Sequence, residues 1–268
     1  MNAAQITRKF VYLILTVVVV WLMPIGRSVA VINPDTLAGL WLLDDGAGKI
    51  VVDTSGNGHD GELVGDLKWA VGRFGQALEF DGDDGMVNTP YISDDQNNAF
   101  TISAWIKPSI DIAKQIVVAG RSNGGPQLNL NASGKAMTGF KMNNGQFAHA
   151  SGTTTFPKGE WTHLAGTYDG SVIKVYVNAT QEGELKPANL PGANAFGFQI
   201  GAFDESLHGG AYIGQFAPAA IDDIAIFNVA LTEEELQSLV DNGLSGALAV
   251  TRMGKMAVTW GNLKSNHQ

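Results

Sequence analysis

Apolar side chains recur at every second position through many short stretches of this chain. In the stretch TISAWIK, Ile102, Ala104 and Ile106 share one face, and the residues between them point the other way. In IKVYV, which begins at Ile173, every second residue is again apolar. A period of two residues is typical of β-strands. The predicted strands are Gly39–Leu43, Ala77–Phe80, Met86–Asn88, Phe100–Lys107, Ile116–Ala119, Gln127–Asn131, Met137–Met142, Gln146–Ala150, Trp161–Tyr168, Ile173–Asn178, Gln199–Ala202 and Ala220–Phe227.

One segment near the C-terminus shows the helical pattern instead. The sequence TEEE, which begins at Thr232, is a capping box, in which the Thr and the third Glu satisfy each other's backbone N–H groups. Leu236, Leu239 and Val240 then form one apolar stripe, and the Asn-Gly pair at 242–243 predicts the end of the helix in a left-handed cap. Many short strands separated by turns, with one short helix on an edge, predict an all-β sandwich or jelly roll.

The composition agrees with a turn-rich β protein and excludes several kinds of function. Of the 268 residues, 33 are Gly and only 16% are charged, while 45% are hydrophobic, which is enough to form a core. The formal net charge of −9 argues against binding to nucleic acid or to an anionic lipid surface. The chain has no Cys, which excludes disulfides, thiolate zinc sites and a cysteine nucleophile.

The first 30 residues have the pattern of an export signal. Arg8 and Lys9 precede an almost wholly apolar run at 10–23, and Ser28 and Ala30 place small residues where a signal peptidase cleaves. The run is shorter than the 18 or more residues that usually cross a bilayer, although an uncleaved membrane anchor remains the alternative. We therefore expect residues 1–30 to be a signal peptide. The mature chain, without a transmembrane segment, would be secreted, periplasmic or on the cell surface.

We find no internal linker, so 31–246 is predicted to be one domain. The tail 247–268 differs in character, because Leu248, Val250, Met256, Val258 and Trp260 have the spacing of strand residues. The sequence leaves open whether this tail is an extra strand, a docking segment or frayed.

Three segments together resemble the laminin-G-like, concanavalin A-like lectin/glucanase superfamily. They are LWLLDDGAGKIVVDTSGNGHDGEL from Leu40, FGQALEFDGDDGMV from Phe74 and AIDDIAIFNVALTEEE from Ala220. Between them, FTISAWIKP and WTHLAGTYDGSVIKVYVN are similar to the middle strands of that family. The resemblance covers most of 38–243 and implies a concanavalin A-like jelly roll of two antiparallel sheets, one concave and one convex.

The loop DTSGNGHDG at 53–61 concentrates carboxylates, amides and glycines. Calcium prefers six to eight oxygen ligands, although the same residues also form ordinary turns. The resemblance implies a structural calcium between this loop and the late Asp-Asp strand. Strict alternation also turns one of Asp222 and Asp223 inward, where a carboxylate needs a partner. The implied ligands are Asp44, Asp53, Asn57, the Gly58 carbonyl and Asp222. The second acidic cluster, DGDDG at 81–85, is interpreted as a solvated hairpin turn.

No residues are predicted to be catalytic. Glycoside hydrolysis needs two acids on opposite sides of the scissile bond, and the Glu-x-Asp-x-Glu pattern of the superfamily's hydrolases is absent from the strands. Glu182 and Glu184 are placed in a hairpin turn, the acids at 204–205 in a Gly-rich loop and those at 233–235 at the helix start, where they complement its dipole. His163 is interpreted as a packed strand residue, and no histidine pair has metal-ligand spacing.

Aromatic residues in predicted loops are the candidate ligand contacts. They are Trp69, Tyr91, Phe203 and Tyr212. We therefore expect a secreted lectin-like module for carbohydrate or glycoconjugate, braced by calcium. The alternative is a cell-surface structural or protein-adhesion domain that binds a surface protein, and a glycoside hydrolase is a further alternative. A fold by itself does not decide among these functions.

Overall fold

The computed structural model describes residues 31–90, 92, 98–192, 197–206 and 213–248. The predicted signal peptide at 1–30 and residues 249–268 of the tail lie outside this range. No helix in the described part of the chain is long and apolar enough to cross a membrane.

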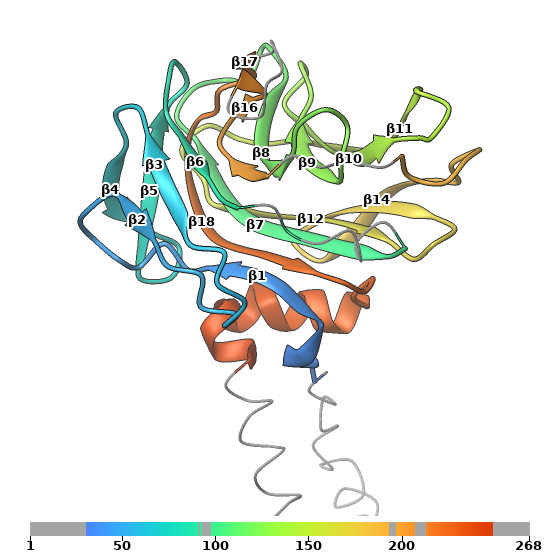
Figure 1. Cartoon of the computed structure of the whole chain (residues 1–268), viewed down its shortest axis with the longest axis horizontal. Helices are drawn as coiled ribbons and strands as arrows, with labels where there is room; N and C mark the ends of the chain where they lie inside the picture. The colour runs from blue at the N-terminus through green and yellow to red at the C-terminus, as the bar shows by residue number, and fades with distance from the viewer. Residues whose placement is uncertain (1–30, 91, 93–97, 193–196, 207–212, 249–268) are drawn as a thin grey trace, which may run out of the picture.

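Two large antiparallel sheets stack face to face to form a sandwich (Figure 1). Sheet A has the strand order β14-β13-β12-β7-β18-β5-β4, with β1 also paired to β18. Its strands are β1 (Leu37–Trp41), β4 (Lys68–Val71), β5 (Gln76–Asp81), β7 (Phe100–Pro108), β12 (Thr162–Tyr168), β13 (Ile173–Val177), β14 (Thr180–Leu185) and β18 (Pro218–Phe227).

Sheet B has the order β11-β10-β9-β8-β15-β6-β3-β2. Its strands are β2 (Ile50–Val51), β3 (Gly61–Val64), β6 (Met86–Asn88), β8 (Ile116–Arg121), β9 (Gln127–Leu130), β10 (Lys135–Lys141), β11 (Phe147–Thr155) and β15 (Phe198–Ile200). A small hairpin of β16 (Phe203–Asp204) and β17 (Ile213–Gly214) is separate from both sheets. The predicted jelly-roll sandwich is therefore confirmed.

The main core lies between the two sheets, where period-two alternation sends apolar side chains from both. Ile102, Ala104 and Ile106 of β7 are fully buried there, as the sequence predicts. The rings of Trp41 and Phe198 stack across the core with centroids 5.3 Å apart. Burying this much aliphatic and aromatic surface supplies most of the driving force for the sandwich.

A second core covers the outer face of sheet A. Residues 233–248 are helical, and Leu236 and Leu239 pack with Tyr176 and Phe227 beneath β1 and β18 (Figure 1). The capping box forms as predicted, with the backbone N–H of Thr232 donating to Glu235 at 2.8 Å and the Glu235 N–H donating back at 3.2 Å. The helix thus covers a sheet face and not an edge, because the alternating residues of β18 are apolar on both faces.

The predicted end of the helix at 242–243 is only half right. Gly243 has the expected left-handed backbone, with φ of 66°, but the helix runs through it without interruption to 248. The backbone N–H of Leu244 donates to the Asp223 carboxylate at 2.8 Å. A carboxylate of β18 therefore accepts a hydrogen bond from the helix directly after the left-handed residue Gly243. Residues 247 and 248 are helical, so the proposed extra strand does not begin there.

Candidate functional site

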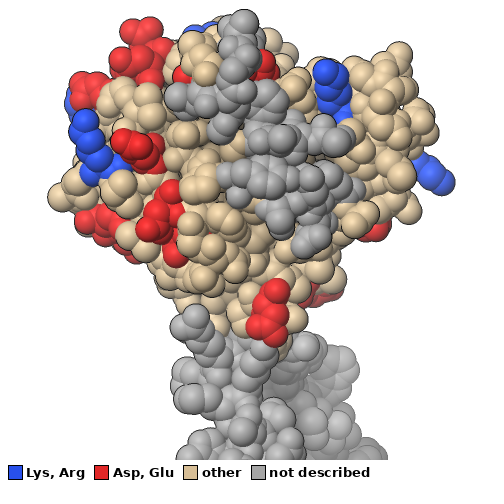
Figure 2. Space-filling model, in the orientation of Figure 1, with Lys and Arg blue, Asp and Glu red and all other residues tan. Residues whose placement is uncertain are grey.

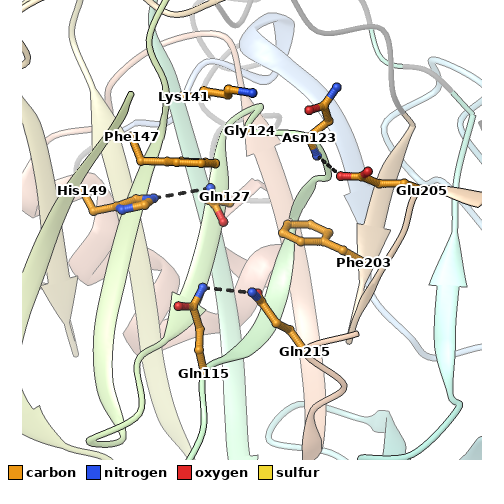
Figure 3. A pocket seen from close by; sticks show the side chains of 10 residues that line it. All are labelled: Gln115, Asn123, Gly124, Gln127, Lys141, Phe147, His149, Phe203, Glu205 and Gln215. Atoms are coloured by element: carbon orange, nitrogen blue, oxygen red, sulfur yellow. Dashed lines mark hydrogen bonds between the residues drawn. The ribbon is translucent and has the colours of Figure 1, made fainter. Parts of the chain in front are cut away.

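A groove of about 480 Å³ opens on the face of sheet B that points away from sheet A (Figure 3). The direction follows from strand alternation, because Ala148 and Ala150 of β11 lie in the core between the sheets. Phe147 and His149 must therefore point outward. The groove is lined by Gln115, Asn123, Gly124, Gln127, Lys141, Phe147, His149, Phe203, Glu205 and Gln215.

One wall of the groove is an aromatic platform on β11. The Phe147 ring lies over the His149 imidazole, with centroids 5.4 Å apart and ring planes 20° from parallel (Figure 3). Phe147 is 54% exposed, which is unusual for so large an apolar side chain. Nε2 of His149 lies 3.4 Å from the Gln127 amide nitrogen. Burial lowers the pKa of His149. The ring is therefore neutral at pH 7 and accepts from the Gln127 amide.

The opposite wall comes from the β16–β17 region. Phe203 faces the platform across the groove and is 5% exposed, so it forms a floor and side of the hollow (Figure 3). The Gln115 amide donates to the Gln215 side-chain oxygen at 3.2 Å, which joins this wall to the start of β8. Gln215 has φ of 59°, a left-handed backbone that is rare for a residue of this size.

The turn between β8 and β9 closes one end of the groove. Asn123 and Gly124 both have left-handed backbones, with φ of 52° and 86°. The Asn123 N–H donates to the Glu205 carboxylate at 3.1 Å, and the Lys141 N–H donates to the Gly124 carbonyl at 2.6 Å. A side chain at 124 would collide with the Lys141 side chain. Gly124 therefore makes room for Lys141. Asn and Gly are the residues that adopt this conformation at the least cost.

The groove offers the chemistry of sugar recognition. An exposed ring can stack on the apolar face of a pyranose, and planar amides both donate to and accept from hydroxyl groups. Glu205 is the one carboxylate among the described residues that line it. Glycoside hydrolysis by the usual route requires a second acid across the bond, so the arrangement suits binding better than cleavage.

The predicted ligand contacts are only partly brought together. Phe203 lines the groove, although it lies on the short strand β16 and not in a loop. Trp69 is on strand β4, half-buried against the core, so its placement in a loop is wrong. The segment KWAV has only four residues, too few for an alternating pattern to identify it as a strand. Tyr91 and Tyr212 lie outside the described residues. Phe147 could have been identified from the sequence, because in QFAHA it alternates with Ala148 and Ala150 and so lies on the opposite face of the strand.

The Asp53 loop closes on itself through hydrogen bonds. The Asp53 carboxylate accepts from the backbone N–H groups of Leu40, Ser55 and His59 at 2.9 to 3.0 Å. Burial raises the pKa of Asp53, but these hydrogen bonds outweigh burial and lower it overall. The Asn57 amide donates to the carbonyl of Leu37 at 2.9 Å, and also to that of the next residue. Gly58 has φ of 79° and allows the turn.

Asp222 and Asp44 belong to a different group, around the β4–β5 turn. One oxygen of Asp222 accepts from the N–H groups of Arg73 and Phe74 at 2.7 and 2.9 Å. The other oxygen is buried without a hydrogen-bond partner. Asp44 accepts from the Gln76 N–H at 2.7 Å. Alternation allows one of the acids at 222 and 223 to point inward, but a bulge after Asp222, with φ of 48° at Asp223, buries both.

The predicted calcium ligands thus lie in two hydrogen-bonded groups, with Asp53, Asn57 and Gly58 in one and Asp44 and Asp222 in the other. Within the described ranges, no three His, Cys, Asp or Glu side chains are arranged to hold a metal ion. The unpartnered Asp222 oxygen is the one feature that suits a hard cation. Calcium binding therefore stays a prediction.

The two buried acids have strongly shifted pKa values. Burial raises the pKa of Asp222 to about 7, and the nearby Asp223 adds to the effect. Burial also raises the pKa of Asp223 to about 6, with a further contribution from Asp44. These shifts follow from placing carboxylates in a region of low dielectric with too few donors to balance the charge.

The remaining acids that the sequence analysis considered have structural roles. Glu182 and Glu184 lie on strand β14 and not in a hairpin turn, because the turn is the two-residue pair at 178–179. Glu182 accepts from the N–H groups of Thr153 and Thr154 at 2.8 and 2.9 Å, which ties β14 to the edge of β11. The cluster at 81–85 joins β5 of sheet A to β6 of sheet B, so it is a crossing between sheets and not a hairpin.

His163 is a packed strand residue, as predicted. It is 1% exposed, and its Nε2 lies 2.8 Å from the Ser103 hydroxyl. Burial lowers its pKa to about 3. The pair has the distance of a nucleophile and its base, but it is sealed beneath Trp105, whose ring centroid is 5.4 Å from the imidazole. Without access for a substrate, this pair stabilises the sheet.

Acidic side chains gather on the part of the surface that carries β2 to β5. Figure 2 shows this cluster on the left of the molecule. The exposed acids in this part of the chain include Glu62, Asp66, Glu79, Asp81, Asp83 and Asp84. The groove lies away from them, on β9 to β11. Among the described residues, the charged ones that line the groove are Lys141 and Glu205, so the groove is less acidic than the molecule as a whole.

The sequence profile of the concanavalin A-like lectin/glucanases superfamily matches residues 81–237, more than half of the chain. A comparison with curated proteins found no match. Among solved structures, the fold is similar to the binding domain of paraclostridial mosquitocidal protein 1, with a TM-score of 0.62 and 16% identity over 77% of this chain and 52% of that one.

Two further structures extend the comparison. Domain 4 of AbnA, a GH43 extracellular arabinanase from Geobacillus stearothermophilus solved in complex with arabinotriose, has a TM-score of 0.59 and 21% identity over 76% of this chain and 98% of that domain. The binding domain of botulinum neurotoxin DC, in complex with rat synaptotagmin II, has a TM-score of 0.61 and 14% identity over 78% and 52%. The chain spans about half the length of the two toxin domains. At these identities the likeness establishes the fold alone.

Proposed function

Because this chain belongs to the concanavalin A-like lectin/glucanases superfamily, we propose that it is a non-catalytic module that binds carbohydrate in the groove beside Phe147. The observation that carries the proposal is Phe147 itself, a phenyl ring that is 54% exposed in a hollow whose other lining residues include four with side-chain amides. A solvent-exposed ring costs free energy unless a ligand covers it, and a sugar face is a suitable cover.

The structural neighbours support a binding role. Domain 4 of the arabinanase was solved with arabinotriose. The match to this chain covers 98% of that domain. The toxin domains are binding domains as well, and one was solved with a protein receptor. That complex is the reason to keep adhesion to a surface protein as the second candidate. The described residues that line the groove include one carboxylate, that of Glu205, which supports binding without hydrolysis.

We also propose that the protein acts outside the cytoplasm. The proposal rests on the positive residues, the apolar run at 10–23 and the small residues at 28 and 30. Secretion, the periplasm and the cell surface all fit this pattern. Fractionation of the producing cells, with the N-terminal sequence of the recovered protein, tests it. Recovery from the cytoplasm with the first 30 residues intact would contradict it.

Depletion by a panel of insoluble polysaccharides tests the carbohydrate proposal. The full chain is mixed with each polysaccharide, the protein left in the supernatant is measured, and released reducing sugar is assayed. We expect depletion by at least one glycan and no released sugar. Released sugar would refute the non-catalytic role. Failure of every glycan, together with capture by a surface protein, would favour adhesion.

A further inference from the structure

A second hollow continues from the first beyond Lys141. It has a volume of about 270 Å³ and shares Asn123, Gly124 and Lys141 with the first. It adds Met142, Asn143, Gly145 and Gly192. The two hollows together form one elongated site, which suits an oligosaccharide better than a single sugar.

The two hollows differ in charge. Among the described residues that line the second hollow, Lys141 is the one charged side chain, whereas the first also contains Glu205. Within the described residues, Lys141 takes part in no ion pair, since the one pair found joins His59 and Asp53. In a chain with a net charge of −9, a lysine left without an acidic partner in a ligand groove is available to a ligand.

Lys141 is also held in place. Its backbone N–H donates to the Gly124 carbonyl, and its own carbonyl accepts from the Gly192 N–H at 2.9 Å. The absence of a side chain at 124 lets the stem of Lys141 pack against the turn. Figure 3 shows the side chain extending across the groove toward Asn123. The residue is half-buried, and its ammonium group can form charge-assisted hydrogen bonds to an anion, which are stronger than those between neutral groups.

We propose, on the basis of the function proposed above, that the ligand is an acidic oligosaccharide whose carboxylate binds Lys141 in the second hollow. A neutral sugar ring then stacks on Phe147 in the first hollow. Glu205 sets this order, because its carboxylate repels an acidic sugar from the first hollow and accepts hydroxyl groups there. Asn123 and Asn143 also line the second hollow, and asparagine amides can donate to the same carboxylate.

Binding of paired ligands tests the proposal. Polysaccharides that carry uronic acids on a neutral backbone, such as glucuronoxylan, are each compared with the same material after carboxyl reduction. We expect the full chain to bind at least one acidic form about tenfold more tightly than its reduced form. The preference should shrink when ionic strength rises from about 0.01 M to about 1 M, because salt screens the pair.

Two variants separate the roles of the hollows. Lys141→Gln should abolish the preference, so that the acidic and reduced forms bind alike, whereas Phe147→Ala should weaken binding of both forms and keep the preference. Lys135→Gln, at the start of the same strand β10 and away from both hollows, is the matched control and should behave as the parent protein. Unchanged unfolding midpoints show that the variants remain folded.

The outcomes distinguish this inference from the proposed function. Equal binding of acidic and reduced forms, or a preference that survives in Lys141→Gln, would overturn the inference while the groove remained a carbohydrate site. Binding of a sulfated galactan, with no binding of any uronate, would indicate that Lys141 binds sulfate and would overturn the proposal that it binds a carboxylate. Absence of binding by any glycan would overturn both proposals.

Discussion

The carboxylate of Asp223 accepts a hydrogen bond from the backbone N–H of Leu244 at 2.8 Å. This bond joins the longest strand of sheet A to the helix that covers it. It depends on two left-handed residues, Asp223 in the bulge of β18 and Gly243 in the helix. The bulge also buries Asp222 beside Asp223, so the link between strand and helix brings two acids together in the interior.

The contribution of Asp222 and Asp223 to the stability of the protein should fall as pH rises from about 4 to about 7. Asp222 has a pKa of about 7 and Asp223 of about 6 in the folded state, both above the ordinary value of 3.8. At these two sites the folded state therefore binds more protons than the unfolded state, and the stability that this gives is lost as pH rises through the folded pKa values. Buried His163, with a folded pKa of about 3, acts in the opposite direction up to its ordinary value of 6.5, so the net fall is smaller than the two acids alone would give. Denaturant unfolding at pH 5 and pH 8 measures the difference.

Asp222→Asn isolates this effect. The amide oxygen can still accept from Arg73 and Phe74, and no charge is buried, so we expect the free energy of unfolding at pH 8 to rise by on the order of 2 kcal/mol. The change should be smaller at pH 5. Asp241→Asn, at an exposed position of the helix, is the control and should alter neither value. A variant less stable than the parent at pH 8 would show that the ionised carboxylate is compensated.

Calcium is the compensation that the resemblance implies. A cation would favour ionised Asp222, one of whose buried oxygens has no hydrogen-bond partner, so calcium at about millimolar concentration should raise the unfolding midpoint at pH 8 more than at pH 5. Asp222→Asn should remove the shift. The same midpoint in calcium and in chelator at pH 8 would contradict the prediction, and the pH dependence above would then stand without a metal.

Alternation predicted much of the fold because it depends only on which residues face the core. Each of the twelve predicted strands overlaps an observed one. The strands that were missed, β2, β3, β4, β14, β16 and β17, are short or carry charges, as in TQEGEL at β14. Such segments become strands by pairing with a neighbouring segment, as β14 does with β13 and β4 with β5. Whether such a segment becomes a strand depends on the strand that it pairs with, so the pattern within the segment alone does not predict it.

Phe147→Ala should weaken carbohydrate binding without loss of stability. Loss of one stacked ring costs on the order of 2 kcal/mol of binding free energy, about a thirtyfold rise in Kd. The ring is 54% exposed, so the unfolding midpoint should hardly change. Val71→Ala is the control, since Val71 is 82% exposed on β4, outside the groove. An unchanged Kd in Phe147→Ala would place the ligand elsewhere.

The groove was harder to predict than the fold because its residues come from separate segments. Gln127, His149 and Phe203 are far apart in sequence and meet only through the pairing of β9, β10 and β11 and the position of the β16–β17 hairpin. Phe203 was identified, but only as one aromatic among several. Exposure separates Phe147 from the buried rings, and exposure depends on which face of a sheet is covered.

Asp53 makes the sharpest prediction about stability. Its carboxylate satisfies three backbone N–H groups, and removing it would leave the buried Leu40 N–H without a partner. We expect Asp53→Ala to lower the free energy of unfolding by about 3 kcal/mol. Because the hydrogen bonds lower the pKa of Asp53, the stability that they give is present at neutral pH and is lost as pH falls through the folded pKa, below about 4.

The opposite pH responses separate the two acidic groups of this fold. Asp53→Ala should destabilise the protein strongly at pH 7 and progressively less as the pH falls below about 4, whereas Asp222→Asn should stabilise it most at pH 8. Asp66→Ala, an exposed acid on the loop before β4, is the control for loss of charge. Equal destabilisation by Asp53→Ala and Asp66→Ala would mean that the loop contributes only its charge. A larger loss in Asp53→Ala would show that hydrogen bonds hold the loop against β1.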